Sequence, residues 1–119
     1  MHEIKFYEDQ NGNSPVYDFI KELSKQTDKD SRVNLKKIND YIQVLSKYGK
    51  MAGEPFIKHL DGDIWEIRPI RNRILFASWS NDGFILLYHF LKKTQKTPQR
   101  EIDQAKRNLK DAQERGETK

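Results

Sequence analysis

The sequence from Asp63 to Arg100 decides how this chain folds: DIWEIRPIRNRILFASWSNDGFILLYHFLKKTQKTPQR. Three runs rich in aliphatic, aromatic and β-branched residues are separated by PIRN at 69–72 and SNDG at 80–83. Short runs of this kind, separated by turn-forming residues, are typical of consecutive antiparallel strands. Asn81-Asp82-Gly83 is the strongest turn signal in the chain. The stretch therefore predicts an antiparallel meander.

Composition indicates a single domain without covalent reinforcement. The chain has 119 residues, enough for one hydrophobic core, and it contains no cysteine. Disulfide frameworks, cysteine zinc sites and thiol nucleophiles are therefore excluded. Residues 1–5 lack the pattern of a signal peptide, and no apolar run approaches the roughly 18 residues of a membrane span. We expect one domain over residues 1–119, in the cytoplasm and without membrane contact.

Two helices are predicted before the meander. Ser14-Pro15 is a typical helix start, and the apolar residues after it recur at helical spacing until about Lys25. A second helix should begin after the acidic segment 27–30 and end at Gly49, a residue that tolerates the backbone of a helix terminus. A sheet needs a cover on each apolar face, so these helices should pack together on one face.

A third helix is predicted after the meander. Thr97 is the expected N-cap and Pro98 the expected first helical residue, with apolar residues recurring at helical spacing from Ile102 onward. The final residues 113–119 are polar and should fray. Together with a short first strand at 3–7, the chain predicts an α+β fold with a small, mainly antiparallel sheet.

The alternation along the strands assigns side chains to faces of the sheet. Trp65 and Ile67 should face the core, which places Glu66 and Arg68 on the other face. The strand after Gly83 is apolar at both parities and should therefore lie inside the sheet. In that strand His89 shares the parity of the odd-numbered residues.

The positive charge of the chain is concentrated in the strand region. Residues 56–100 contain eight Lys or Arg and four Asp or Glu, whereas 1–55 contain nine of each and 101–119 five of each. The whole net charge of +4 therefore arises in this region. A basic patch on an otherwise balanced protein favours a polyanionic partner, although chance and solubility give the same count.

Most catalytic chemistries find no support in the sequence. No serine lies in a nucleophile-elbow context, the histidines at 2, 59 and 89 lack metal-ligand spacing, and phosphate-loop fingerprints are missing. A cation-rich site with one carboxylate remains, and we expect it to need no metal or cofactor. Such a site suits RNA cleavage by the 2′-hydroxyl, because cations stabilise charge that builds on the phosphoryl oxygens.

A family resemblance rests on three motifs. IWEIRP at 64–69, the Arg71-x-Arg73-Ile74 that follows, and above all LYHFLKKTQKTP at 87–98 before a helix resemble the HigB-type toxins of the phage-derived branch of the RelE/ParE superfamily. The resemblance covers most of the chain. It implies a RelE-like fold with two N-terminal helices, a meander and a C-terminal helix. It also implies a type II toxin that acts as a ribosome-dependent mRNA endonuclease.

The resemblance also implies roles for individual residues. Arg73 and Lys93 would stabilise the scissile phosphate and Arg68 would hold it, with Glu66 either transferring a proton or orienting Arg68. We expect Arg73 and Lys93 to lie outside the apolar core and to meet where two strands pair. Further contacts to RNA are expected from surrounding residues, namely Lys58, His59, Arg71, Lys92 and Lys96.

The residue that acts as general base has more than one candidate. The C-terminal tyrosine that acts in some RelE members has no match, because Gln99-Arg100-Glu101 occupies that region. His59 and His89 are candidates, but His89 reads better as a structural histidine on a buried strand and His59 as a surface residue near RNA. The identity of the base and the codon preference are not given by the sequence.

Partners and rival functions follow from the same resemblance. The implied partner is a helix-turn-helix antitoxin of the HigA kind, in a higher-order hetero-oligomer, and the implied substrate is mRNA on the ribosome. One alternative is a ParE-like toxin that inhibits its target by protein binding alone. Another is a nucleic-acid-binding adaptor. Both alternatives leave RNA intact.

Overall fold

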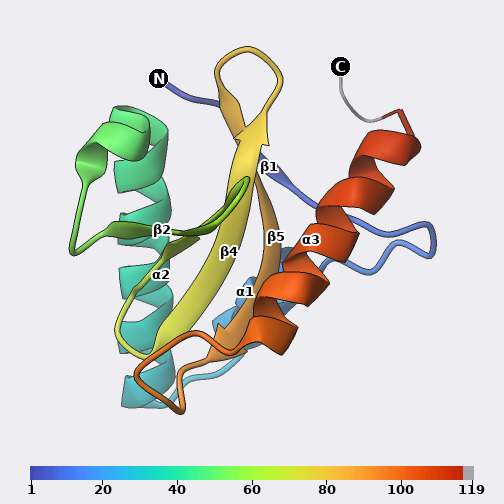
Figure 1. Cartoon of the computed structure of the whole chain (residues 1–119). Helices are drawn as coiled ribbons and strands as arrows, with labels where there is room; N and C mark the ends of the chain where they lie inside the picture. The colour runs from blue at the N-terminus through green and yellow to red at the C-terminus, as the bar shows by residue number, and fades with distance from the viewer. Residues whose placement is uncertain (117–119) are drawn as a thin grey trace.

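The computed structural model of the chain describes residues 1–116. It has the expected α+β architecture, with helices on both faces of a five-stranded sheet (Figure 1). In chain order the elements are β1 (Ile4–Phe6), α1 (Pro15–Ser24), α2 (Lys29–Tyr48), the 3₁₀-helix η1 (Gly49–Ala52), β2 (Ile57–Asp61), β3 (Ile64–Ile67), β4 (Asn72–Trp79), β5 (Gly83–Leu91) and α3 (Gln99–Glu114).

The sheet is mixed, with strand order β1-β5-β4-β3-β2. Strands β3, β4 and β5 form the predicted antiparallel meander, β2 extends it by antiparallel pairing with β3, and β1 pairs in parallel with β5. As expected, β5 lies inside the sheet, between β1 and β4. The parallel contact of β1 is possible because both N-terminal helices intervene before the chain returns to the sheet.

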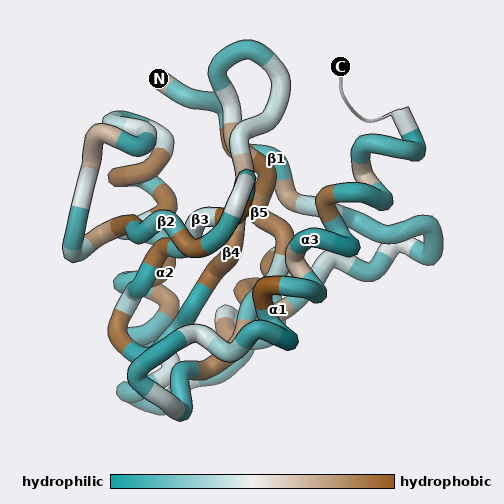
Figure 2. The backbone as a smooth tube through the Cα atoms, viewed as in Figure 1, coloured by the Kyte–Doolittle hydropathy of each residue, from teal (hydrophilic) through white to brown (hydrophobic). Residues whose placement is uncertain are grey.

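Two apolar layers hold the fold together. One lies between the sheet and the helices α1 and α2, as predicted, and contains Val16, Ile38, Leu45, Ile67, Ile74, Phe76 and Leu86. The other lies between the sheet and α3 and contains Ile64, Leu75, Ile85, Leu87, Ile102, Ala105 and Leu109. Figure 2 shows hydrophobic residues along the strands and hydrophilic residues along the outer connections. We refer to the second surface of the sheet as the α3 face.

The predicted ends of the first two helices are confirmed. Asp28 caps α2 by accepting a hydrogen bond from the Ser31 amide, at 3.0 Å. Gly49 ends α2 with a φ of 61°, and a Cβ there would lie 2.6 Å from the His2 ring, so only glycine fits. Ser14 occupies the N-cap of α1, but its side chain makes no cap bond; its amide instead donates to the Asp18 carboxylate.

The predicted start of α3 is wrong by one residue. Pro98 occupies the N-cap position and Gln99 is the first helical residue, with no side-chain cap. The Thr97 hydroxyl, expected to cap the helix, donates instead to the buried carboxylate of Glu66 at 2.8 Å. A buried charged acceptor stabilises this donor more than a solvated helix end would.

A β-bulge changes the facing of the second half of β5. Leu75 pairs with Tyr88, whereas its neighbour Phe76 pairs with Leu86, so Leu87 is an extra residue on β5. Beyond the bulge, Tyr88 and Phe90 pack with the α3 layer. His89 therefore lies on the opposite face, contrary to what simple alternation predicts.

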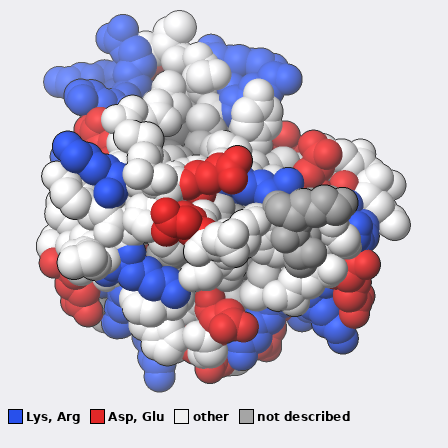
Figure 3. Space-filling model, turned by 90° about the horizontal axis from the view of Figure 1, so that it is seen from above, with Lys and Arg blue, Asp and Glu red and all other residues white. Residues whose placement is uncertain are grey.

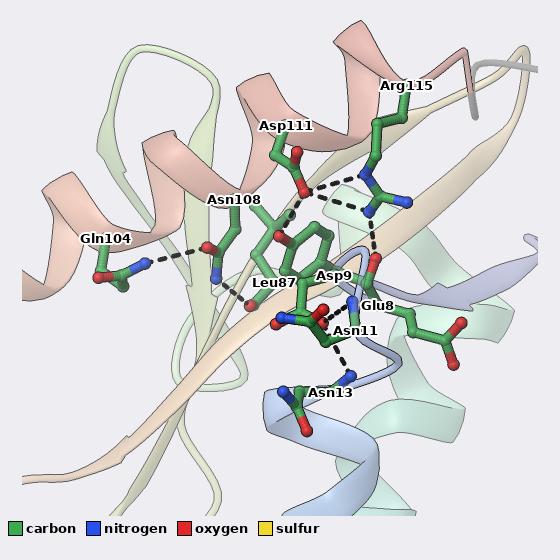
Figure 4. Close-up of polar contacts among 10 residues, drawn as sticks. Glu8, Asp9, Asn11, Asn13, Leu87, Gln104, Asn108, Asp111 and Arg115 are labelled. Atoms are coloured by element: carbon green, nitrogen blue, oxygen red, sulfur yellow. Dashed lines mark hydrogen bonds and ion pairs between the residues drawn. The ribbon is translucent and has the colours of Figure 1, made fainter.

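Polar contacts fasten α3 to the rest of the molecule (Figure 4). The Asn108 amide donates to the carbonyl of Leu87 at 2.9 Å, so it bonds the bulged backbone. The Tyr7 hydroxyl donates to Asp111 at 2.7 Å, and Arg115 bonds both Asp111 and the carbonyl of Glu8. Residues 117–119, part of the segment expected to fray, lie outside the described residues.

For residues 1–116, no helix combines the length and the apolar composition needed to cross a bilayer.

Candidate active site

The candidate site begins at the turn between β3 and β4. Arg73 pairs with Phe90 on β5, so both side chains share the α3 face. The Arg73 guanidinium turns back and donates to the carbonyls of Asn72, at 2.8 Å, and Ile70, at 3.1 Å. Ile70 has a φ of 60°, a strained conformation for a β-branched residue. Arg73 therefore stabilises the turn that carries it.

Glu66 forms the floor of the site. It lies on the α3 face and is only 1% exposed. One carboxylate oxygen accepts the Thr97 hydroxyl bond, and the other lies 3.3 Å from Nε of Arg68. Because both oxygens are engaged and enclosed, the arrangement favours the orienting role of Glu66 over proton transfer to RNA. The Arg68 side chain keeps about 25% exposure and can reach a ligand.

Arg73 is buried, contrary to the expectation that it lies outside the core. It is 5% exposed. Burial lowers the pKa of its guanidinium, and the positive charge of nearby Arg68 lowers it further, while Glu66 opposes the shift. Arginine is protonated over the whole physiological range all the same. Arg73 thus supplies a fixed positive charge behind Arg68 rather than an accessible contact.

Lys93 completes the cationic group from the other side. The predicted convergence of strand ends is confirmed, because Asn72 pairs with Leu91 and the Lys92 amide donates to the Arg71 carbonyl at 2.7 Å. The connection 92–98 consequently passes beside the β3–β4 turn, at the lower end of the sheet in Figure 1. Lys93 is exposed there and lines two hollows, of about 360 and 440 Å³.

Four of the five expected RNA contacts gather near this group. Lys58 is exposed and pairs with Glu66 across β2 and β3, so it shares the α3 face. Arg71 and Lys92 line the 440 Å³ hollow together with Lys93. Lys96 is exposed in the same connection, where its carbonyl accepts the Thr94 hydroxyl at 2.6 Å.

Neither candidate histidine offers an unengaged ring to the site, although His89 contributes to the lining of the 360 Å³ hollow. His59 pairs with Trp65, whose ring packs with the α1 and α2 layer, so His59 lies on the other face. His89 stacks on Phe19 of α1 at 3.6 Å and bonds the Asn72 side chain at 3.0 Å. Burial lowers the pKa of His89 to about 4, so it is neutral at physiological pH. The interpretation of His89 as a structural histidine is therefore supported.

Comparison with known families supports the resemblance seen in the sequence. Residues 18–110 match the model of the phage-derived Gp49-like protein family (DUF891), a family of the RelE/HigB-like toxin type. The chain belongs to the Gp49-like family. The matched region contains Glu66, Arg68, Arg73, Lys93 and Thr97. Among proteins of curated function, none matches the chain significantly.

The far end of the Gp49-like domain differs in charge from the candidate site. Figure 3 views the end that carries the β4–β5 hairpin and the chain termini, opposite to the connection 92–98. Lys and Arg are interspersed there with Asp and Glu, as is usual for a solvated surface. At the site end, Arg71, Lys92 and Lys93 line one hollow that has no Asp or Glu in its lining.

Sequence reasoning missed two polar groups of this Gp49-like site. The Thr97 hydroxyl donates a hydrogen bond to Glu66, and Tyr88 lies close enough to Glu101, at the start of α3, for the two side chains to interact. Burial raises the pKa of Tyr88, and the negative charge of Glu101 raises it further. The KTP sequence ahead of a helix pointed to Thr97, but as a cap. No local signal pointed to the Tyr88 contact, since it depends on the bulge.

Within residues 1–116, no cluster of three or more His, Asp or Glu side chains could hold a metal ion.

Proposed function

We propose that this Gp49-like protein is a HigB-type toxin that cleaves mRNA on the ribosome without a metal ion. The observation that carries the proposal is the convergence of Arg68, Arg73 and Lys93, from three segments of the chain, at one end of the sheet. Of the accessible members of this group, Lys93 lines two hollows large enough for nucleotide groups, and the Arg68 side chain keeps about 25% exposure.

The reaction uses the 2′-hydroxyl of the RNA as the nucleophile. Its oxygen forms a bond to the adjacent phosphorus, the bond from phosphorus to the 5′ oxygen breaks, and a proton moves from the 2′ oxygen to solvent or a base while the leaving oxygen gains one. Negative charge grows on the non-bridging oxygens in the transition state. Lys93 and Arg68 stabilise that charge directly, and buried Arg73 adds a fixed positive field behind them.

Glu66 and Thr97 prepare this arrangement before RNA binds. The carboxylate holds Arg68 on one side and the connection 92–98 on the other, through the Thr97 hydroxyl. Lys93 lies in that connection. The two cations are therefore set in position relative to each other by one buried carboxylate, which reduces the ordering that catalysis requires.

We further propose that a helix-turn-helix antitoxin of the HigA kind neutralises the protein in a hetero-oligomer in the cytoplasm. Two observations support this proposal: the RelE/HigB-like type of the family and the positive charge of the site, which a partner protein can cover. Co-expression with the product of an adjacent reading frame should restore growth and should yield a complex that copurifies.

Induction of the protein in translating cells tests the nuclease activity. Growth and translation should stop, and primer extension should reveal new 5′ ends within translated messages. Lys93→Ala should abolish cleavage, while Lys110→Ala, an exposed cation on α3, is the matched control. Arrested growth with intact mRNA would instead indicate the ParE-like mode, and normal growth with soluble protein would refute the toxin proposal.

A further inference from the structure

Lys93 and Thr94 separate two hollows of different chemistry. One, of about 440 Å³, is lined by Ile70, Arg71, Lys92 and Gln95 besides these two residues, and we name it the cationic hollow. The other, of about 360 Å³, is lined by His89, Phe90, Leu91, Pro98, Arg100 and Glu101 besides the same two residues, and we name it the aromatic hollow. A chain of nucleotides that crosses Lys93 has one hollow on each side.

The cationic hollow offers no means of distinguishing bases. Its charged lining residues are Arg71, Lys92 and Lys93, and no carboxylate lines it. Contacts of this kind neutralise phosphates and fix the register of a strand, but they do not depend on sequence. This hollow therefore suits the sugar-phosphate backbone.

The aromatic hollow contains the elements of a base-binding site. The bulge at Leu87 turns Phe90 to the α3 face, where it lies partly exposed at the hollow. Splayed RNA bases stack on aromatic side chains and are read along their hydrogen-bonding edges. Glu101 supplies a carboxylate to read such an edge, and its side chain is about 15% exposed.

The Glu101 carboxylate is held in place before any ligand arrives. The Tyr88 side chain lies close enough to interact with it, and one of its oxygens lies 3.8 Å from Nε of the largely exposed Arg100 side chain. A fixed carboxylate accepts hydrogen bonds only. It pairs well with an exocyclic amino group, as in adenine, cytosine or guanine. Uracil instead places carbonyl oxygens on both sides of its N3–H, and these repel a carboxylate.

We propose that the aromatic hollow binds the nucleobase next to the cleaved phosphate and that Glu101 selects a base with an exocyclic amino group. This inference rests on the proposed function, since it places the scissile phosphate at Lys93. It adds the position of a neighbouring base and the chemical class that is accepted. Phe90 is the stacking platform, Arg100 the phosphate contact at the rim and Glu101 the specificity-determining residue.

Nucleotide titrations of the full chain followed by NMR test the hollow without any need for catalysis. The 5′-monophosphates of adenosine, cytidine, guanosine and uridine are added separately, and the backbone amide shifts of 88–101 are recorded. We expect the largest chemical-shift changes at Phe90, Lys93, Arg100 and Glu101. Binding of uridine monophosphate should be about tenfold weaker than that of the others, the size of one hydrogen bond to a charged acceptor.

The decisive comparison is between two conservative variants on the same helix. Glu101→Gln keeps the size of the side chain and one acceptor oxygen but adds a donor, so uridine monophosphate should bind as well as the others. Glu114→Gln, at an exposed position near the end of α3, should leave the preference unchanged. Shifts scattered over the surface, or equal affinity for all four nucleotides in the wild type, would overturn the proposal.

The result separates this inference from the proposed function. If nucleotides bind at Phe90 and Glu101 with the expected preference, base binding in the aromatic hollow is supported even when no mRNA is cleaved. In that case only the nuclease proposal is refuted. Conversely, if the wild type cleaves mRNA and the Glu101→Gln variant cleaves it next to the same bases, the nuclease proposal holds and the assignment of Glu101 is wrong.

Discussion

Replacing Arg73 and Lys93 separately by alanine should show that the two cations differ in what they support. Lys93 is exposed, and it belongs to neither apolar layer. Arg73 is 5% exposed and bonds two backbone carbonyls of the strained β3–β4 turn. Only the Arg73 variant should therefore lose stability, although both should lose cleavage.

The expected loss of stability can be worked from these contacts. Each hydrogen bond from a charged donor contributes about 1.5–3 kcal/mol, so the two to Ile70 and Asn72 together contribute about 3–6 kcal/mol. Truncation also relieves the cost of burying a guanidinium, which is several kcal/mol and offsets part of that sum. We expect Arg73→Ala to lower the free energy of unfolding by about 1–3 kcal/mol and Lys93→Ala to change it by less than about 0.5 kcal/mol.

The loss of cleavage is set by the charge that develops in the transition state. Removing one group that stabilises such charge typically costs about 2.7–4 kcal/mol, or roughly a hundred- to a thousandfold in rate. Urea unfolding followed by circular dichroism gives the stabilities, and mRNA cleavage in a translation system gives the rates, at a temperature where both variants stay folded. The reasoning would be refuted if Arg73→Ala were as stable as the wild type, or if Lys93→Ala cleaved at a near wild-type rate.

Three further predictions follow from individual contacts. Thr97→Val should lower the cleavage rate and destabilise the fold by about 1–3 kcal/mol because the Glu66 carboxylate loses its donor. Thr97→Ser should keep both at the wild-type level, and Thr27→Val, at an exposed position between α1 and α2, should change neither. Burial lowers the pKa of His89 from 6.5 to about 4 in the folded state only. Neutral His89 therefore leaves the folding stability unaffected above pH 6.5, and the free energy of unfolding should drop by up to about 3 kcal/mol as the pH falls towards 4. Urea titrations between pH 4 and 7 should show this slope, and His89→Phe should flatten it. Burial and the hydrogen bond to Asp111 raise the pKa of Tyr7 to about 12. The free energy of unfolding of the wild type should therefore fall as the pH rises through 10 to 12. Tyr7→Phe should lack this fall and should be about 1 kcal/mol less stable at neutral pH.

The elements of the fold could be predicted because their signals are local. Asp28 caps the helix that follows it, Gly49 adopts the positive φ that ends the same helix, and Asn81-Asp82-Gly83 connects two paired strands. Each feature depends only on residues that are close together in the sequence. The approach of the segments that carry Arg73 and Lys93 could also be predicted, because antiparallel pairing brings the start of β4 to the end of β5.

The exposure of the site residues could not be predicted in the same way. An arginine is usually solvated, and only the carbonyls of the β3–β4 turn explain why Arg73 lies buried. Thr97 has the local features of an N-cap, but a carboxylate 31 residues earlier in the chain is the better partner. Arg73 exchanges water for the carbonyls of its own turn, and Thr97 exchanges the helix end for a carboxylate that is distant in the sequence.

The bulge at Leu87 determines which side chains reach the candidate site. Without the extra residue, His89 would lie on the α3 face next to Arg73, and Phe90 would lie against α1. With it, Phe90 faces the aromatic hollow, and Tyr88 reaches Glu101. The Asn108 side chain on α3 bonds the carbonyl of Leu87, the extra residue itself. The helix that covers the α3 face therefore also stabilises the local irregularity of β5, so the composition of the site depends on the docking of α3 as much as on the strands that carry its residues.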